Sequence, residues 1–128
     1  MTDISKIDMN RVDGLISLLE SIDYVVEYKL PTEEDPSWYR VYKSGWLEQG
    51  GIYKDTEDKT VTINLLKPFK THEYTVHRTN ITENSGTGSS RADGVSNRTT
   101  TSFKGYYLSS MYALLWTACG QGATQTDA

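Results

Sequence analysis

The chain has 128 residues, a formal net charge of −4, 37% hydrophobic residues and a single cysteine. This length suits one domain with a modest core, and an acidic chain without a Lys/Arg cluster among aromatics argues against nucleic-acid binding. No apolar run approaches a membrane-spanning length, no secretory signal is visible at the start, and one cysteine forms no disulfide within the chain.

The spacing of residues 4–23 predicts an amphipathic helix. Its apolar residues recur at steps of three and four and make one stripe, which consists of Val12, Leu15, Ile16, Leu19 and Ile22. A lone helix of this length is marginal in water, so the stripe needs a partner. Two partners are open: copies of the same helix, or the face of the sheet that follows. We therefore assign residues 1–23 as a helix for trimerisation or docking.

Short alternating segments predict an antiparallel β domain over residues 24–120. The expected strands lie at 24–30, in a hairpin at 38–51, and at 59–66, 73–82, 99–108 and 111–120. The last of these is the most apolar and is expected to be central. The predicted fold class is mainly β, an antiparallel β-sandwich or partly closed barrel preceded by one N-terminal helix. Residues 121–128 are small and polar and predict a flexible tail.

The hairpin carries the most distinctive motif of the chain. Two aromatic-rich segments flank Lys43-Ser44-Gly45, which predicts a tight turn. The paired glycines Gly50 and Gly51 suit a bulge or the close approach of a backbone or large ring. For Glu48 we expect a structural carboxylate that accepts backbone N–H bonds around a tight turn at Gly50-Gly51. The expected structural motif consists of Trp38, Trp46, Glu48, Gly50, Gly51, Trp116 and Gly120.

Three segments appear in a particular order. Residues 38–51 read WYRVYKSGWLEQGG, Pro68-Phe69 precedes Tyr74-x-Val76, and Trp116-x-Ala118-x-Gly120 closes the series. Over about residues 38–120 this series resembles the C-terminal knob domain of phage tail-fibre proteins. The resemblance implies a homotrimer on the virion surface that recognises a host cell-surface glycan or protein. Some phage fibres bind iron through an H-x-H pair, but this chain has none, so we expect no metal and no cofactor.

The polar stretch 84–98 is the longest loop signal and is rich in Gly and Ser. Long loops in compact domains carry function or move. Two interpretations therefore stay open, a mobile hairpin tip and a ligand-contacting loop. In the second, the ligand-binding residues are Arg91, Asp93, Asn97 and Arg98. The acidic segment 31–37 is a second, weaker candidate for a ligand-facing loop.

The sequence offers little catalytic chemistry. Cys119 could pair with His72 or His77, but a thiol in an apolar strand is a poor nucleophile. Paired carboxylates for glycoside hydrolysis are the most serious alternative, and they would have to lie within about 5–10 Å of each other. Glu48 is the one acid in a motif, and its structural role is the simpler one. We therefore expect no enzymatic activity.

The chain starts at Met1 and is short for a fibre knob. We expect it to dock onto another virion structural protein through its N-terminal helix. This leaves a second class of function open, a capsid or tail decoration protein or head fibre that binds no receptor.

Overall fold

The computed structural model describes residues 9–82 and 94–124. Within them the chain forms one helix and eight strands. The elements are α1 (Met9–Ser21), β1 (Val25–Lys29), β2 (Trp38–Tyr42), β3 (Trp46–Tyr53), β4 (Lys59–Asn64), β5 (Thr75–Ile81), β6 (Val95–Ser96), β7 (Ser102–Tyr107) and β8 (Ala113–Gln121).

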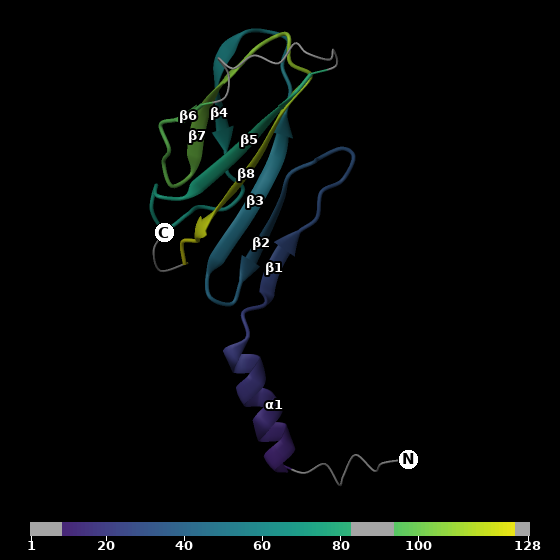
Figure 1. Ribbon diagram of the computed structural model, residues 1–128, viewed down its shortest axis with the longest axis vertical. Helices are drawn as coiled ribbons and strands as arrows, with labels where there is room; N and C mark the ends of the chain where they lie inside the picture. The colour runs from purple at the N-terminus through teal and green to yellow at the C-terminus, as the bar shows by residue number, and fades with distance from the viewer. Residues whose placement is uncertain (1–8, 83–93, 125–128) are drawn as a thin grey trace.

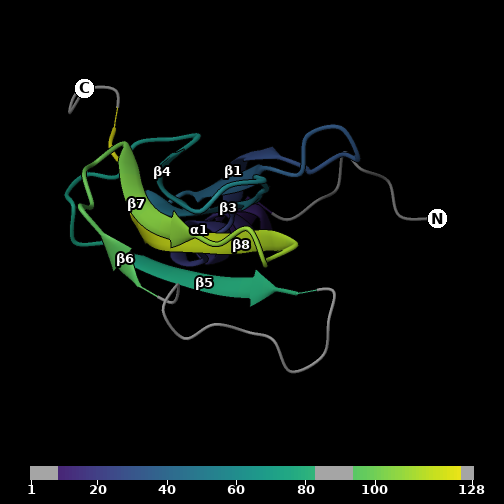
Figure 2. The same cartoon turned by 90° about the horizontal axis from the view of Figure 1, so that it is seen from above.

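The strands form two antiparallel sheets (Figures 1 and 2). The larger sheet has the order β1-β2-β3-β8-β5 and the smaller one β4-β7-β6. The predicted mainly β fold with one N-terminal helix is confirmed. The sheets do not close into a barrel, because β1 and β5 end the larger sheet without pairing to the smaller one.

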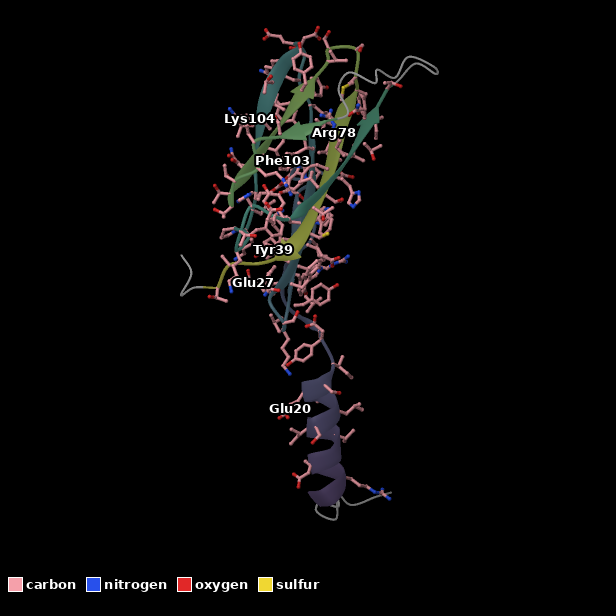
Figure 3. The ribbon with its side chains drawn as sticks, turned by 60° about the vertical axis from the view of Figure 1, so that its left-hand side comes forward. Glu20, Glu27, Tyr39, Arg78, Phe103 and Lys104 are labelled. Atoms are coloured by element: carbon pink, nitrogen blue, oxygen red, sulfur yellow. The ribbon has the colours of Figure 1, made fainter. Side chains whose placement is uncertain are left out.

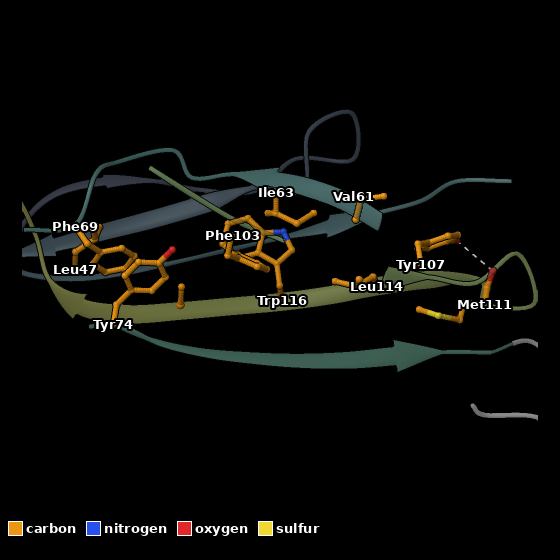
Figure 4. Close-up of a cluster of buried hydrophobic side chains, with 11 residues drawn as sticks. Leu47, Val61, Ile63, Phe69, Tyr74, Phe103, Tyr107, Met111, Leu114 and Trp116 are labelled. Carbon is orange, nitrogen blue, oxygen red and sulfur yellow. Dashed lines mark hydrogen bonds between the residues drawn. The ribbon is translucent and has the colours of Figure 1, made fainter. Parts of the chain in front are cut away.

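The core lies between the two sheets, where alternation along each strand turns every second side chain inward. In β4, Val61 and Ile63 are buried while Thr60 and Thr62 are exposed. They meet side chains of β3, β7 and β8 in one cluster (Figure 4). As predicted, β8 is central, and its Trp116 packs edge-to-face on Phe103 of β7 with ring centroids 5.5 Å apart.

One end of the core is closed by aromatic stacking. Phe69 and Tyr74 stack with centroids 4.2 Å apart, and the Tyr74 hydroxyl donates to the Ser102 carbonyl over 2.9 Å. Gly120 makes room for this pair, because a Cβ there would lie 2.9 Å from the Tyr74 Cβ. The motif position Gly120 is therefore a packing requirement.

The hairpin forms as the sequence predicts, with β2 and β3 joined by Lys43-Ser44-Gly45. Gly45 has φ 91°, a left-handed conformation that favours glycine in such a loop. The expected turn at Gly50 and Gly51 is wrong, since both lie inside β3 in regular register with β8.

The end of β8 lies beside this hairpin turn. Gly122 donates to the Gly45 carbonyl over 2.8 Å, and Ala123 donates to the Pro68 carbonyl over 3.0 Å. The first residues of the segment 121–128 therefore belong to the folded body, while 125–128 lie outside the described residues.

Helix α1 extends away from the strands along the long axis of the molecule instead of packing across a sheet (Figure 1). Its junction with β1 is fastened to the hairpin turn. The Asp23 carboxylate accepts hydrogen bonds from the Ser44 N–H (2.9 Å) and hydroxyl (2.7 Å). The Lys43 ammonium donates to the Glu20 carbonyl over 3.0 Å. A cation is favourable there, because the C-terminal end of a helix carries a partial negative charge.

Candidate assembly surface and ligand pocket

Large apolar side chains gather on the surface of α1 and β1. Of the fourteen large hydrophobic residues that are exposed among the described residues, ten lie between positions 15 and 30. We call these ten residues the apolar strip: Leu15, Ile16, Leu18, Leu19, Ile22, Tyr24, Val25, Val26, Tyr28 and Leu30. Their exposed fractions run from 39% to 69%. Patches of this kind mark interaction surfaces.

The stripe predicted for the helix contributes four members to this strip, Leu15, Ile16, Leu19 and Ile22. The fifth stripe residue, Val12, is half-buried. None of the four exposed residues is covered by the chain's own sheet. Of the two partners that the sequence left open, the face of the following sheet is not the one that covers these four residues.

On the side of β1 that faces the smaller sheet, polar contacts hold the strand in place. Glu27 forms an ion pair with Lys67 at 2.6 Å and lies beside Tyr39 (Figure 3). Hydrogen bonds from Lys67 and Tyr39 lower the pKa of Glu27 below its ordinary value. β1 is therefore anchored on one side by charge, and its apolar side chains are left on the other.

The motif glycines accommodate tryptophan rings. A Cβ on Gly50 would lie 2.7 Å from the Trp116 carbonyl oxygen and 2.8 Å from the Trp38 ring nitrogen. A Cβ on Gly51 would lie 3.1 Å from the Trp116 ring on the opposite, inner face. The predicted close approach of a large ring is thus present at both positions. Trp46, by contrast, is 40% exposed.

Glu48 is bound by side chains rather than by backbone. Its carboxylate accepts a hydrogen bond from the Arg40 guanidinium at 2.6 Å. Burial alone would raise the pKa of Glu48, but hydrogen bonds from Arg40 and Tyr42 hold it below its ordinary value. The expected contact with backbone N–H groups around the glycines is wrong, because Arg40 lies directly opposite Glu48 in the hairpin register.

The backbone role belongs to the next residue, Gln49, which the sequence analysis missed. Its side chain is fully buried and donates to the Lys67 carbonyl over 2.9 Å. Its amide oxygen accepts from the backbone N–H of Leu66 (2.8 Å) and Lys67 (3.1 Å). The inward parity of Gln49, between Leu47 and Gly51, was the available signal.

Of the four predicted ligand residues, the structure describes Asn97 and Arg98. Arg91 and Asp93 lie outside the described residues. Asn97 has φ 50°, a left-handed conformation that asparagine tolerates, and follows β6. Arg98 donates to the Tyr74 carbonyl and lies 3.9 Å from the Glu73 carboxylate. The structure therefore brings Arg98 to the start of β5.

Arg98 lines a pocket of about 490 Å³ at the open edge of the fold, between the starts of β5 and β6. The remaining lining residues are Glu73, Tyr74, Thr75, Val76 and Val95. The guanidinium of Arg98, the carboxylate of Glu73 and the hydroxyl of Thr75 suit the hydroxyl groups of a sugar. The buried ring of Tyr74 offers it no free face. This pocket is the candidate ligand site among the described residues.

The segment 31–37 folds on itself. The Asp35 carboxylate accepts from the Ser37 N–H (3.1 Å) and hydroxyl (2.5 Å) and pairs with Lys29 at 3.1 Å. These hydrogen bonds from Ser37, and then the contact with Lys29, lower the pKa of Asp35 to about 2. Asp35 thus ties its loop to β1.

Arg78 is a second residue that the sequence did not single out. From β5 its guanidinium donates to the Gly94 and Tyr106 carbonyls, each over 3.1 Å, and so reaches the smaller sheet (Figure 3). Gly105 leaves room for this guanidinium, because a Cβ at position 105 would lie 3.0 Å from it. Arg78 therefore joins the two sheets.

Other chemistry is sparse within residues 9–82 and 94–124. They hold no group of three or more His, Cys, Asp or Glu side chains placed to bind a metal ion. Burial, and then the nearby Glu48, raise the pKa of the Cys119 thiol, which lowers its thiolate content. The one helix they contain lacks the length and apolar content needed to cross a bilayer.

Comparisons with known proteins identify a similar fold among solved structures. No family model matches the chain, and no curated protein matches its sequence significantly. Among solved structures, an N-truncated R2-type pyocin tail fibre is similar at a TM-score of 0.57 with 18% sequence identity. The similarity covers 94% of this chain and 51% of the tail fibre, so the chain spans about half of that structure. The resemblance to tail-fibre proteins is therefore confirmed at the level of the fold.

Proposed function

We propose that this chain is the subunit of a tail-fibre-like attachment protein on a virion surface. It associates as a homotrimer and recognises a host cell-surface glycan or protein without catalysing a reaction. The pyocin tail-fibre fold supports a tail-fibre-like role. The number of three copies follows the resemblance to tail-fibre knobs.

The observation that carries the proposal is the uncovered apolar surface of α1. The helix has 13 residues and extends away from both sheets (Figure 1). Isolated helices shorter than about 12–15 residues are marginal in water, and a helix normally gains stability by packing an apolar face. Leu15 and Leu19 are 61% and 58% exposed. Parallel copies of α1 would bury these positions in one bundle.

The test is the mass of the full chain in solution by light scattering. We expect a trimer for the unaltered chain and dissociation for the double variant Leu15→Gln/Leu19→Gln, because amides at these positions weaken an apolar bundle. Ser17→Gln is the matched control, since it also places an amide on α1 but removes no apolar side chain. A monomeric unaltered chain would overturn the proposed assembly.

Receptor binding is tested separately with the assembled chain on an array of host surface glycans. Arg98→Ala should reduce binding, whereas Lys104→Ala, on the exposed face of β7, should leave it unchanged. Thermal unfolding of both variants checks that the fold is kept.

A decoration or head-fibre protein without a receptor is the second candidate. Arg98 favours it, because its guanidinium already contacts Tyr74 and Glu73 and so has a structural use. Absence of glycan and host-cell binding together with tight docking to a capsid or tail protein would support this candidate. Another virion structural protein at the N-terminal end of the chain is expected in both cases.

A further inference from the structure

An apolar groove lies on the outer face of the larger sheet, at its β1 edge. Its volume is about 540 Å³, and it is lined by residues of β1, β2 and the start of the following loop, namely Val25, Tyr28, Lys29, Leu30, Pro31, Trp38, Tyr39 and Arg40. Tyr28 lies opposite Arg40 in the β1–β2 register. Arg40 shares a face with Trp38, two residues away. The face carrying these residues points away from the core, which receives Tyr39 and Val41 instead.

We propose that this groove is a second contact between copies of the chain, where β1 and β2 of one copy pack against the β1 region of its neighbour. The inference rests on the proposed self-association and extends it from α1 onto the body. The shared surface is then the whole apolar strip together with the groove.

The area of the strip supports this extension. In a trimer each copy shares its buried surface between two neighbours, and a standard stable interface buries roughly 800 Å² per partner. The five strip residues from Tyr24 to Leu30 double the number of exposed apolar side chains that the five from Leu15 to Ile22 offer. A contact that includes β1 is therefore larger than one made by the helix alone.

The geometry of the junction joins the two surfaces. Asp23 is held by Ser44, and Lys43 holds the last turn of α1, so the helix emerges in a fixed direction beside the start of β1. When two copies pack in parallel along α1, their β1 strands are therefore placed beside each other at the same level. β1 also ends its sheet, and an exposed apolar edge strand is open to further pairing unless it is covered.

The charges in the groove fit a second copy better than an anionic ligand. Arg40 is already neutralised by Glu48 at 2.6 Å, and Lys29 by Asp35 at 3.1 Å. The two cations that line the groove are therefore each paired within their own copy. What remains to be covered is apolar, namely Tyr28 and Leu30, which are 62% and 69% exposed.

The test uses full-length variants and light scattering over a dilution series. Tyr28→Glu and Leu30→Glu each place a charge in the groove at a position exposed in the single chain, so the fold of the single chain should be unaffected. Each should raise the concentration of half-dissociation at least about 10-fold. Tyr106→Glu is the matched control, because Tyr106 is 41% exposed on the smaller sheet. Its half-dissociation concentration should match that of the unaltered chain, and thermal unfolding verifies folding of all three.

The outcomes separate this inference from the proposed function. If Leu15→Gln/Leu19→Gln dissociates the assembly while Tyr28→Glu and Leu30→Glu leave it unchanged, the groove contact is wrong and the helix contact stands. If the groove variants dissociate it and Tyr106→Glu does not, the second contact is established. A chain that is monomeric at every concentration, or that binds only a different virion protein, overturns both.

Discussion

At the scale of single residues, the two tryptophans and two glycines of the hairpin motif depend on each other. Trp38 lies over Gly50 on the outer face of β3, and Trp116 lies against Gly51 on the inner face. One strand thus receives a ring on each face at consecutive positions. This arrangement requires two adjacent residues without side chains.

Gly50→Ala should destabilise the fold by about 1–3 kcal/mol, the usual range for overpacking. The added Cβ would lie 2.7 Å from a backbone oxygen, which moves less readily than a side chain. Chemical denaturation measures the change. Gly94→Ala is the control, because a Cβ there meets nothing within 4 Å. Equal stabilities for the two variants would contradict the packing argument.

The contrast between Glu48 and Gln49 shows where sequence reasoning at this scale stops. The motif places an acid and an amide side by side, and either could contact backbone groups. Strand parity turns Gln49 inward and Glu48 outward. That parity becomes readable only once Gly50 and Gly51 are placed inside the strand rather than in a turn. Contacts such as Arg78 with Gly94 join residues far apart in sequence and leave no local pattern.

At the scale of elements, β1 is the strand held most by charge. Lys29 and Glu27 pair with Asp35 and Lys67, while the apolar side chains of the strand contribute little to the core. Both carboxylates have lowered pKa values. A carboxylate with a lowered folded pKa stabilises the fold above its unfolded pKa, and this contribution is lost as the pH falls through the folded pKa.

For Asp35 this window runs from the ordinary value of 3.8 down to about 2. We therefore expect Asp35→Asn to lower the melting temperature at neutral pH and to match the unaltered chain near pH 2. Melting curves of both proteins across this range measure the difference. A constant difference at all pH values would show that the charge of Asp35 makes no contribution.

Most elements could be predicted because alternation and turn residues are local. Val61 and Ile63 mark β4, and Lys43-Ser44-Gly45 marks the hairpin turn. A sandwich of two sheets was one of the two predicted folds, but the assignment of each strand to a sheet was not predictable, because it depends on pairing between distant segments. β3, for example, pairs with the distant β8. Whether α1 packs on the body was also left open, because an apolar stripe does not specify which surface covers it.

At the scale of the whole molecule, folding of α1 and assembly should be one process. The body has its own core, with Trp116 only 5% exposed, whereas α1 has no comparable packing. Dilution should therefore reduce the helical circular-dichroism signal together with the mass, while the backbone amides of β8 in the body stay protected from hydrogen exchange. A helical signal that persists in the monomer would show that α1 is stable alone.

The alignment of α1 with the long axis of the strands also has a mechanical consequence (Figure 1). A pull along the helix enters the body through Asp23, Ser44 and β1, parallel to the strands. Hydrogen bonds between antiparallel strands lie perpendicular to that direction. They are therefore loaded in shear, many at once, rather than opened one after another. The fold is thus oriented to resist tension applied along its own helix.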